Sequence, residues 1–297
     1  MIRVIALVFS LVVCVTAMGQ EPATPEDKAV NAILKLGGSV TRDEKLPGRP
    51  VVFVNMSVPT VTDADLKDLK ELKGLRQLYL SHTQITDVGL KDLKELKGLQ
   101  TLELSHAQVT NSGMKDLKEL KGLKMLGLCS TQITDAGLKE LKELKGLQTL
   151  WLGFTQITDA GLKDLKELKG LRDLDLSYTQ ITDAGLKELK ELRSLQGLNL
   201  EYTKITDAGL KELKELKGLQ RLYLYNTGIT DAGLNDLKEF KELRDLYLGF
   251  TRITDAGLKE LKELKGLKIL ELYGTQITDT GMKDLRQALP KTDIRGP

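Results

Sequence analysis

A 24-residue period runs through most of this chain and limits its fold more than any other feature. The skeleton of the period is L-x-x-L-x-L-x-x-T-x-I-T-D-x-G-L-K-x-L-K-E-L-K-G, and it recurs without insertion or deletion. The units start at Leu75, Leu99, Leu123, Leu147, Leu171, Leu195, Leu219, Leu243 and Leu267. Such a period predicts a solenoid that grows by adding units, because one unit cannot bury its own apolar residues.

Each unit changes its apolar spacing halfway along. Residues 75–80 alternate leucine with variable residues, which predicts a short strand with one buried face. From Asp87 to Gly98 the leucines fall on one side and the charged residues on the other, which predicts a helix. We expect the Asp87 carboxylate to cap the first turn of this helix and Gly98 to end it in a left-handed conformation.

These residues resemble the leucine-rich-repeat pattern over about 240 positions of the chain. The I-T-D-x-G-L segment is similar to the cysteine-containing class of such repeats, known from F-box-associated and ribonuclease-inhibitor-like proteins. The resemblance implies an α/β fold, a right-handed leucine-rich-repeat solenoid (horseshoe) with parallel strands on the concave face and helices on the convex face. It implies a role in binding and no catalytic activity.

Threonine stands where that class has an internal Cys or Asn. A threonine hydroxyl at this turn can bond to the backbone, so we expect a column of hydrogen bonds along the solenoid. Ala107 interrupts the column, and the second unit should therefore be slightly weaker. The column consists of Thr83, Thr131, Thr155, Thr179, Thr203, Thr227, Thr251 and Thr275.

The period also suggests how the chain is divided. The register extends back by one degenerate unit before Leu75. Before that unit, residues 25–36 can form an amphipathic helix that Gly37-Gly38 ends, and we expect this segment to cover the open end of the core. Near the other end, Asp293-Ile294 can add an edge strand. The predicted parts are a signal peptide at 1–19, an N-terminal helical cap at 20–50, ten repeats at 51–290 and a C-terminal tail at 291–297.

The first residues have the three parts of a secretory signal peptide. Arg3 gives a positive start, residues 4–15 form an apolar run, and Ala17-Met18-Gly19 offers small residues for cleavage. The run is shorter than the roughly 20 apolar residues that a spanning helix needs. We therefore expect an exported chain (secreted, periplasmic or at the cell surface) with no membrane span after cleavage. Cleavage also removes Cys14 and leaves Cys129 without a disulfide partner.

The charge balance argues against one class of partner. Lys and Arg together number 44 against 42 Asp and Glu, so the formal net charge is only +2. Such a chain has no basic field that would attract nucleic acid, and we expect no nucleic-acid partner. The lysines of the helical half each have an acidic neighbour, which is typical of a solvated convex face.

Nearly all aromatic residues after residue 24 lie at a few positions of the period, and Phe240 in the helical half is the exception. All seven Tyr, the only Trp and both His lie around the first three leucines of a unit, where side chains should point outward from the concave face. Phe154, Tyr178 and Tyr202 are one period apart, so their rings should lie side by side near Trp151. Rigid amphipathic rings are enriched at recognition surfaces. The predicted partner-binding residues are Tyr79, Trp151, Phe154, Asp173, Asp175, Tyr178, Tyr202, Arg221, Tyr223, Tyr225, Tyr247, Phe250 and Tyr273.

Two simpler interpretations of this surface stay open. Tyrosine is a good strand residue, and aromatic ladders stabilise sheets by themselves, so the rings can be strand filling alone. The charges near the rings are mixed, with Asp173 and Asp175 among Arg172, Arg221 and Arg244. Such pairing favours a specific partner, but it also fits ordinary solvated surface.

Metal binding and catalysis find little support in the sequence. His82 and His106 are one period apart, but they lack a metal-binding spacing motif, so we expect no metal site and no cofactor. Asp173 and Asp175 lie on an open face, which does not shift one carboxyl pKa as acid–base catalysis requires. No Ser-His-Asp order, phosphate-binding glycine loop or nucleophile elbow occurs, and we expect no enzyme activity.

The sequence thus predicts a non-catalytic exported scaffold that recognises a protein or peptide through its concave face. A carbohydrate-binding surface protein is the first alternative, because the same rings can stack on sugars. A structural spacer is the second. The three share one fold and differ in what, if anything, the aromatic residues contact.

Overall fold

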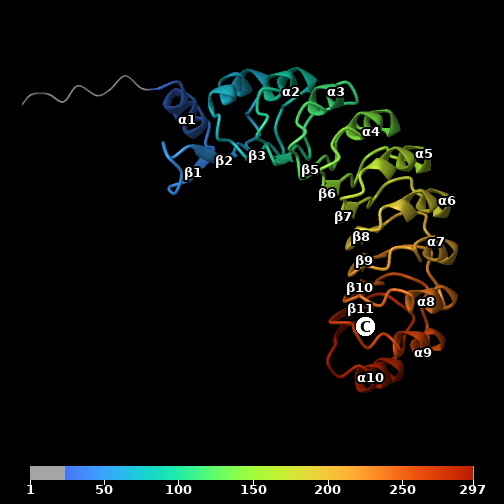
Figure 1. Cartoon of the computed structure of the whole chain (residues 1–297). Coiled ribbons are helices and arrows are strands. Elements are labelled where there is room, and N and C mark those ends of the chain that lie inside the picture. Colours follow the sequence, from blue (N-terminus) through green and yellow to red (C-terminus); the bar gives the residue numbers. More distant parts are fainter. Residues whose placement is uncertain (1–23, 297) are drawn as a thin grey trace, which may run out of the picture.

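Residues 24–296, which the computed structural model describes, form one curved solenoid (Figure 1). The strands lie along the inner, concave side of the curve, and the helices cover the outer, convex side. Twelve strands join in one sheet whose spatial order follows the sequence. This is the α/β solenoid that the period predicts. The predicted signal peptide, residues 1–19, lies outside the described residues.

From Leu75 onward each repeat contributes one short strand, and equivalent residues of neighbouring repeats lie beside each other. Leu78 is paired with Leu102, and Leu102 with Leu126, in parallel register. The first strand differs, since β1 runs antiparallel to β2. The strands are β1 Ser39–Arg42, β2 Val51–Asn55, β3 Gln77–Tyr79, β4 Thr101–Glu103, β5 Met125–Gly127, β6 Thr149–Trp151, β7 Asp173–Asp175, β8 Gly197–Asn199, β9 Arg221–Tyr223, β10 Asp245–Tyr247, β11 Ile269–Glu271 and β12 Asp293–Arg295.

The convex helices are shorter than the predicted segment from Asp87 to Gly98, and several turns are 3-10 helix (η). Leu90, Leu93 and Leu96 recur every third residue, which matches a 3-10 turn of about 3 residues better than an α-turn of about 3.6. Within residues 24–296, no helix has the length and apolarity needed to cross a membrane. The helices are α1 Pro25–Lys35, η1 Asp63–Glu71, α2 Asp87–Leu93, α3 Met114–Leu117, α4 Asp135–Leu141, α5 Asp159–Leu162, η2 Lys163–Glu167, α6 Asp183–Leu186, η3 Lys187–Glu191, α7 Asp207–Glu212, α8 Asp231–Leu237, η4 Asp255–Gly257, α9 Leu258–Leu261 and α10 Asp279–Ala288.

Leucine and isoleucine side chains from every repeat fill the space between the sheet and the helices. Leu78 and Leu80 from the strand side are fully buried, as are Leu90 and Leu93 from the convex side. Burial of apolar surface stabilises by about 25 cal/mol per Å² removed from water, so this core is the main term that holds the repeats together. The stability of each repeat therefore depends on its neighbours.

The Thr-Asp pair at the start of each convex segment acts differently from the prediction. Thr86, not Asp87, is the N-cap of α2, and its hydroxyl oxygen accepts from the Val88 N–H at 3.2 Å. The Asp87 carboxylate extends to the next repeat, where it accepts from the N–H and the hydroxyl of Thr110 at 2.8 and 2.5 Å. The predicted capping role of Asp87 is wrong, because its carboxylate joins two repeats.

The same inter-repeat pair recurs along the solenoid and explains the glycine of the motif. A Cβ atom on that glycine would overlap the carboxylate of the preceding repeat, as Gly161 would overlap Asp135. The first repeat follows the N-terminal segment instead of a repeat, and it has Asp65 in the glycine position. The pairs are Asp63–Thr86, Asp87–Thr110, Asn111–Thr134, Asp135–Thr158, Asp159–Thr182, Asp183–Thr206, Asp207–Thr230, Asp231–Thr254 and Asp255–Thr278.

Gly98, at the end of the convex segment, does not have the left-handed backbone that we predicted for it. Two other repeats carry Ser194 and Glu242 at this position. Because the position has an ordinary φ, a side chain there meets no conformational strain. The turn after the convex helix is therefore closed without a left-handed glycine.

The predicted threonine column is confirmed. The Thr83 hydroxyl donates to the Leu80 carbonyl at 2.7 Å, within one turn. In the repeat that starts at Leu99 the backbone N–H of Ala107 donates to the Leu104 carbonyl at 3.0 Å instead. The equivalent hydroxyl bonds are made by Thr131, Thr155, Thr179, Thr203, Thr227, Thr251 and Thr275.

The N-terminal segment packs on the first repeat. Helix α1 ends before Gly37, whose φ of +84° confirms the predicted stop. Ala29 and Ile33 are buried in the core, whereas Leu34 is 51% exposed. Strand β1 was not predicted, because a strand of four residues is too short to show a clear period.

At the C-terminal end, β12 pairs with β11 and confirms the predicted edge strand. The strand includes Arg295, which we had placed in the C-terminal tail, and buries Ile294. The proposed division into a cap, ten repeats and a tail stays a prediction.

Candidate functional site

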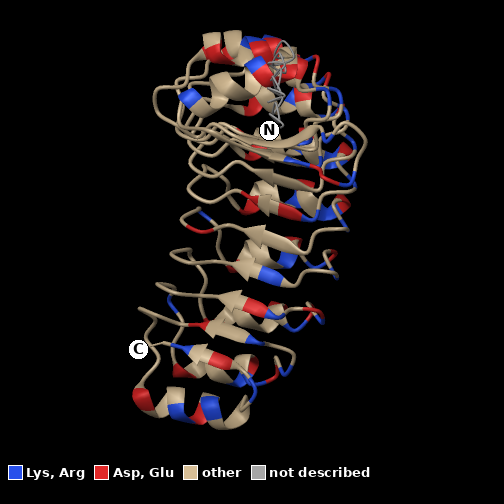
Figure 2. Cartoon of the chain, turned by 90° about the vertical axis from the view of Figure 1, so that its left-hand side faces the viewer, with Lys and Arg blue, Asp and Glu red and all other residues tan. Residues whose placement is uncertain are grey.

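Three side chains per repeat point outward from the sheet. In the repeat of β7 they are Asp173 and Asp175 on the strand and the largely covered Ser177 two residues after it, and they alternate with the buried Leu174 and Leu176. The outward side chains of all the strands form the concave face, part of which is turned toward the viewer in Figure 2. Each outward column crosses the strands, since equivalent residues lie in register.

The residue after the outward serine or its equivalent is the first of a turn with unusual backbone. Phe154, Tyr178, Tyr202 and Phe250 have φ between 53° and 56°, in the left-handed region. Gly274, with φ of +67°, holds the same position in the last repeat. Bulky side chains are uncommon at such φ values, and each costs on the order of 1 kcal/mol. Strand propensity cannot account for these four aromatic residues, because they lie beyond the strand ends.

The rings of this turn stack on one another. The centroids of Phe154 and Tyr178 lie 3.9 Å apart, and those of Tyr178 and Tyr202 lie 4.1 Å apart. Tyr225 continues the row, at 5.4 Å from Tyr202 and 4.9 Å from Phe250. We call these five residues the aromatic edge. The predicted contact of three consecutive rings is confirmed, and the row extends over two more.

Partial burial raises the pKa of two tyrosines of the aromatic edge, Tyr178 and Tyr225. Removal from water raises the pKa of Tyr178 to about 12, and the neighbouring Tyr202 hydroxyl adds to the rise. The pKa of Tyr225 is also raised, first by burial and then by Tyr202. These two hydroxyls are protonated at neutral pH, as ordinary tyrosines are, and can donate hydrogen bonds to a partner.

The other predicted aromatic residues are distributed along the face. Tyr223 and Tyr247 stack at 4.4 Å on neighbouring strands. Tyr79 lies near the N-terminal end, where its ring is 5.5 Å from that of Phe53. Tyr273 is exposed after β11, one repeat beyond the aromatic edge. The structure thus does not join Tyr79 to the rings of the central repeats.

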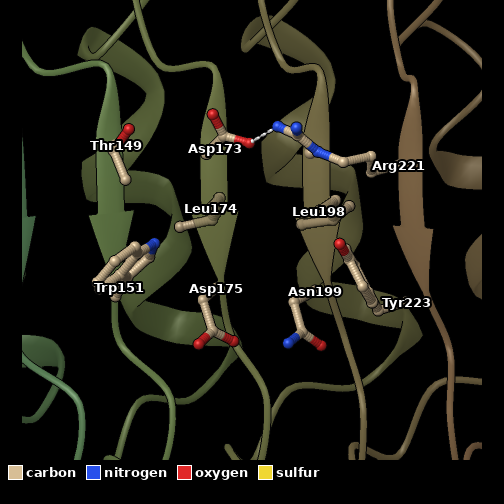
Figure 3. Close-up of a pocket in the computed structure, with 10 residues that line it drawn as sticks. Thr149, Trp151, Asp173, Leu174, Asp175, Leu198, Asn199, Arg221 and Tyr223 are labelled. Atoms are coloured by element: carbon tan, nitrogen blue, oxygen red, sulfur yellow. Dashed lines mark hydrogen bonds and ion pairs between the residues drawn. The ribbon is translucent and has the colours of Figure 1, made fainter. Parts of the chain in front are cut away.

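A hollow of about 430 Å³ lies at the centre of the concave face, and we call it the central hollow (Figure 3). Trp151 and Tyr223 stand on its two sides, and Asp175 and Asn199 lie between them in the same register. Its volume is within the roughly 300–1,000 Å³ of small-ligand pockets. The lining residues are Thr149, Trp151, Asp173, Leu174, Asp175, Gly197, Leu198, Asn199, Arg221 and Tyr223.

An ion pair between Asp173 and Arg221 borders the hollow. The two side chains meet across β8, where a Cβ atom on Gly197 would overlap the Asp173 carboxylate. Gly197 and Asn199 were not among the predicted site residues. A sequence signal was present, because Gly197 is the one glycine in its outward column, at the first strand position of β3–β11.

The strand register separates charges that appeared mixed in the sequence. Arg172 and Arg244 precede their strands and are exposed at the edge of the sheet. At the outward positions of β3–β11 the one basic residue is Arg221, which is paired with Asp173. The carboxylates at these positions are Glu103, Asp173, Asp175, Glu201, Asp245 and Glu271. The concave face is therefore acidic, although the whole chain has a slight positive charge.

Two of these carboxylates are poorly compensated. Glu103 is only 5% exposed; its Oε1 accepts from the Ser105 N–H at 2.8 Å, and its Oε2 is buried with no partner among the described residues. It lies over Gly127, between β4 and the strand of Trp151. Burial raises the pKa of Glu201, and the negative charge of Asp175 raises it further.

Sequence comparison identifies the repeats themselves. The family model described as "Leucine Rich repeat" matches residues 75–94, 99–118, 171–190, 191–214 and 243–262. The chain is a leucine-rich-repeat solenoid. No curated protein matches it in sequence.

Solved structures agree with this leucine-rich-repeat fold. An internalin C2 from Listeria monocytogenes is 23% identical over 93% of this chain and 95% of its own, with a TM-score of 0.54. A structure described as PEPR1–AtPEP1 is 18% identical over 87% of this chain and 36% of its own, with a TM-score of 0.51. At these identities the likeness is one of fold.

Groups with possible metal or thiol chemistry occupy the N-terminal half of the leucine-rich-repeat face. The His82 and His106 rings stack at 4.0 Å and are exposed. Within residues 24–296, no group of three or more His, Cys, Asp and Glu is placed to hold a metal ion. Cys129 is free, and burial, followed by the charge of Asp175, raises its thiol pKa to about 12. The thiol therefore stays protonated at neutral pH.

Proposed function

We propose that this leucine-rich-repeat solenoid is an exported, non-catalytic scaffold that recognises a protein or peptide through its concave side. The contacting residues are those of the aromatic edge and the central hollow. The observation that carries the proposal is the row of exposed rings held at positive φ. Strain of this kind persists where the surroundings impose it, and it gathers at functional sites.

The composition of the face fits a protein partner. Tyr, Trp and Arg are enriched at hot spots of protein interfaces, because they bring large contact area with few rotatable bonds. Trp151, Tyr178 and Phe250 are each exposed by more than a third. Solenoids of this kind offer extended concave surfaces for binding. The apolar segment at residues 4–15 supports export, and the I-T-D-x-G-L motif supports the cysteine-containing class with threonine in the internal Cys position.

A carbohydrate ligand is the second candidate, because Trp151 stands exposed beside Asp175 and Asn199. Sugars stack on ring faces. Tyr178 is sandwiched between the rings of Phe154 and Tyr202, which leaves mainly its edge for a ligand. The stacked row therefore suits the irregular surface of a peptide or protein better than the flat faces of a sugar chain.

Selection from a displayed peptide library tests the proposal. Purified residues 24–297 serve as bait, and each selected peptide is titrated against Tyr178→Gly, which the left-handed backbone accepts without strain. Hot-spot truncations cost at least about 2 kcal/mol, so we expect affinity to fall about 30-fold. Tyr79→Ala, another ring on the same sheet, is the matched control and should change affinity little.

Two results would contradict the proposal. Selected peptides whose affinity is equal for the wild type and Tyr178→Gly do not bind at the aromatic edge. Failure of selection, together with binding of a neutral oligosaccharide that Trp151→Ala abolishes, would favour the carbohydrate candidate.

A further inference from the structure

We propose that the partner is a basic segment, and that the central hollow receives one of its lysine or arginine side chains. This inference rests on the proposed recognition of a peptide or protein and names the chemistry of that partner. A second cationic side chain, four residues away in an extended segment, lies against Glu103.

Charge complementarity is the first argument. The outward positions of β3–β11 carry six carboxylates and a single arginine, and that arginine is paired with Asp173. A partner with positive charge is attracted to such a face, whereas an acidic partner is repelled. The whole chain is nearly neutral, but its lysines are gathered on the convex segments. The carboxylates of the concave face are therefore not balanced by lysines on the same face.

The shape of the central hollow is the second argument. Trp151 presents its ring at one side and Tyr223 at the other, with the Asp175 carboxylate between them (Figure 3). A cation over the face of an aromatic ring gains about 0.5–2 kcal/mol, and Trp is the best ring for this contact. A carboxylate beside the ring completes the usual environment of a bound guanidinium or ammonium group.

The buried carboxylate of Glu103 is the third and independent argument. Its Oε2 is withdrawn from water without a partner among the described residues, which is costly for an ionised group. A cationic side chain laid along this part of the face would supply the missing partner once the Glu103 carboxylate turns from Gly127 toward the open face. Glu103 lies on β4 and Asp175 on β7, so Trp151 stands between them.

The spacing of these carboxylates sets the register of the partner. Strands β4 and β7 are three steps apart in the sheet, or about 14 Å at ~4.8 Å per step. An extended peptide advances ~3.4 Å per residue, so residues i and i+4 are also about 14 Å apart. A segment that crosses the strands with basic residues at i and i+4 therefore meets Glu103 and Asp175 together.

Fluorescence titration with defined peptides tests this inference. Three labelled peptides share a Gly-Ser background and differ only at positions i and i+4, which are both arginine, both glutamine or both glutamate. Binding is followed by anisotropy of the label and by the emission of Trp151, the only tryptophan of the chain. We expect the arginine peptide to bind at least about tenfold more tightly than the glutamine peptide, given the strength of charge-assisted contacts.

Matched variants separate contact from general attraction. Asp175→Asn keeps the shape of the side chain and should weaken the arginine peptide about tenfold. Glu103→Gln should weaken it by a similar factor, which provides a second reading should one variant fold poorly. Glu271→Gln removes the same charge four strands from Asp175, beyond the screening length of about 10 Å, and should change affinity less than about threefold.

Each outcome decides for or against the inference. Equal binding of the arginine and glutamine peptides, or an Asp175→Asn variant that binds as the wild type does, overturns it. If all three peptides fail while a library-selected neutral peptide binds and is lost in Tyr178→Gly, the basic partner is wrong and the proposed function stands. If neither kind of peptide binds, both proposals fail.

Discussion

The inter-repeat pair between Asp135 and Thr158 predicts a large effect for a very small substitution, Gly161→Ala. The added methyl group would overlap the Asp135 carboxylate, which now accepts from the N–H and the hydroxyl of Thr158 at 2.8 and 2.6 Å. To make room the carboxylate must leave both donors. Gly146→Ala, whose new Cβ would come no closer than 3.6 Å to its nearest neighbour atom, the Leu123 carbonyl oxygen, is the matched control.

The magnitude follows from the two bonds. Hydrogen bonds to a charged group contribute about 1.5–3 kcal/mol each, and the lower end applies here because the pair is only partly buried, so the loss is about 3 kcal/mol. Gly161 lies in α5, where alanine is favoured over glycine by about 0.5–1 kcal/mol. We expect Gly161→Ala to lower the free energy of unfolding by about 2 kcal/mol, and Gly146→Ala to change it by less than about 0.5 kcal/mol.

A double-mutant cycle identifies the cause. In an Asp135→Ala background the overlap with the carboxylate is gone and only the flexible end of Leu138, 3.1 Å away, must yield, so Gly161→Ala should be close to neutral. Urea unfolding followed by circular dichroism gives the free energies. Hydrogen exchange at the Thr158 amide gives a local reading, which repeat proteins need because their unfolding is not always two-state. The reasoning is refuted if Gly161→Ala destabilises equally with and without the Asp135 carboxylate.

Three further predictions concern single side chains. Ala107→Thr should restore the hydroxyl bond to the Leu104 carbonyl and raise the free energy of unfolding by about 1 kcal/mol, measured by urea unfolding; no gain would show that the threonine column contributes nothing. Because its thiol pKa is raised to about 12, Cys129 should react with iodoacetamide at neutral pH at least about a hundredfold more slowly than in urea, and comparable rates would contradict its burial. Burial and the negative charge of Asp175 raise the pKa of Glu201 in the folded state. The ionised side chain therefore destabilises the folded state at pH values above this raised pKa, and the cost disappears below the pKa that Glu201 has in the unfolded state. Glu201→Gln should therefore stabilise at neutral pH, with a gain that fades as the pH falls through the raised pKa of the folded state toward about 4.5, the ordinary value for Glu; a pH-independent gain would show another cause.

The fold could be predicted from the sequence because the leucine spacing changes at the same point of every period. The role of the aspartate could not, since capping within its own helix and bonding to the next repeat use the same Thr-Asp pair. One residue, Asp65, did indicate the bond between repeats. It replaces the motif's glycine in the one described repeat that has no repeat before it among the described residues. The short convex helices could also have been predicted, because Leu90, Leu93 and Leu96 have the spacing of a 3-10 turn.

The candidate site was predicted only in part. Register alone placed Phe154, Tyr178 and Tyr202 together, and the structure confirms their contact. Their left-handed backbone could not be inferred, because bulky residues are rarely found at positive φ. The central hollow depends on the missing side chain of Gly197, which its column in the sequence did mark, and on the ion pair of Arg221 with Asp173 across β8, which the sequence does not show.

The central claim is that the concave face, with its aromatic edge and central hollow, is where this solenoid meets its partner. Emission of Trp151 tests it most directly, because this single tryptophan lies in the hollow. A library-selected peptide that carries a quencher should reduce this emission, with the same dissociation constant that anisotropy gives. Binding by anisotropy with unchanged Trp151 emission would place the partner elsewhere and contradict the claim.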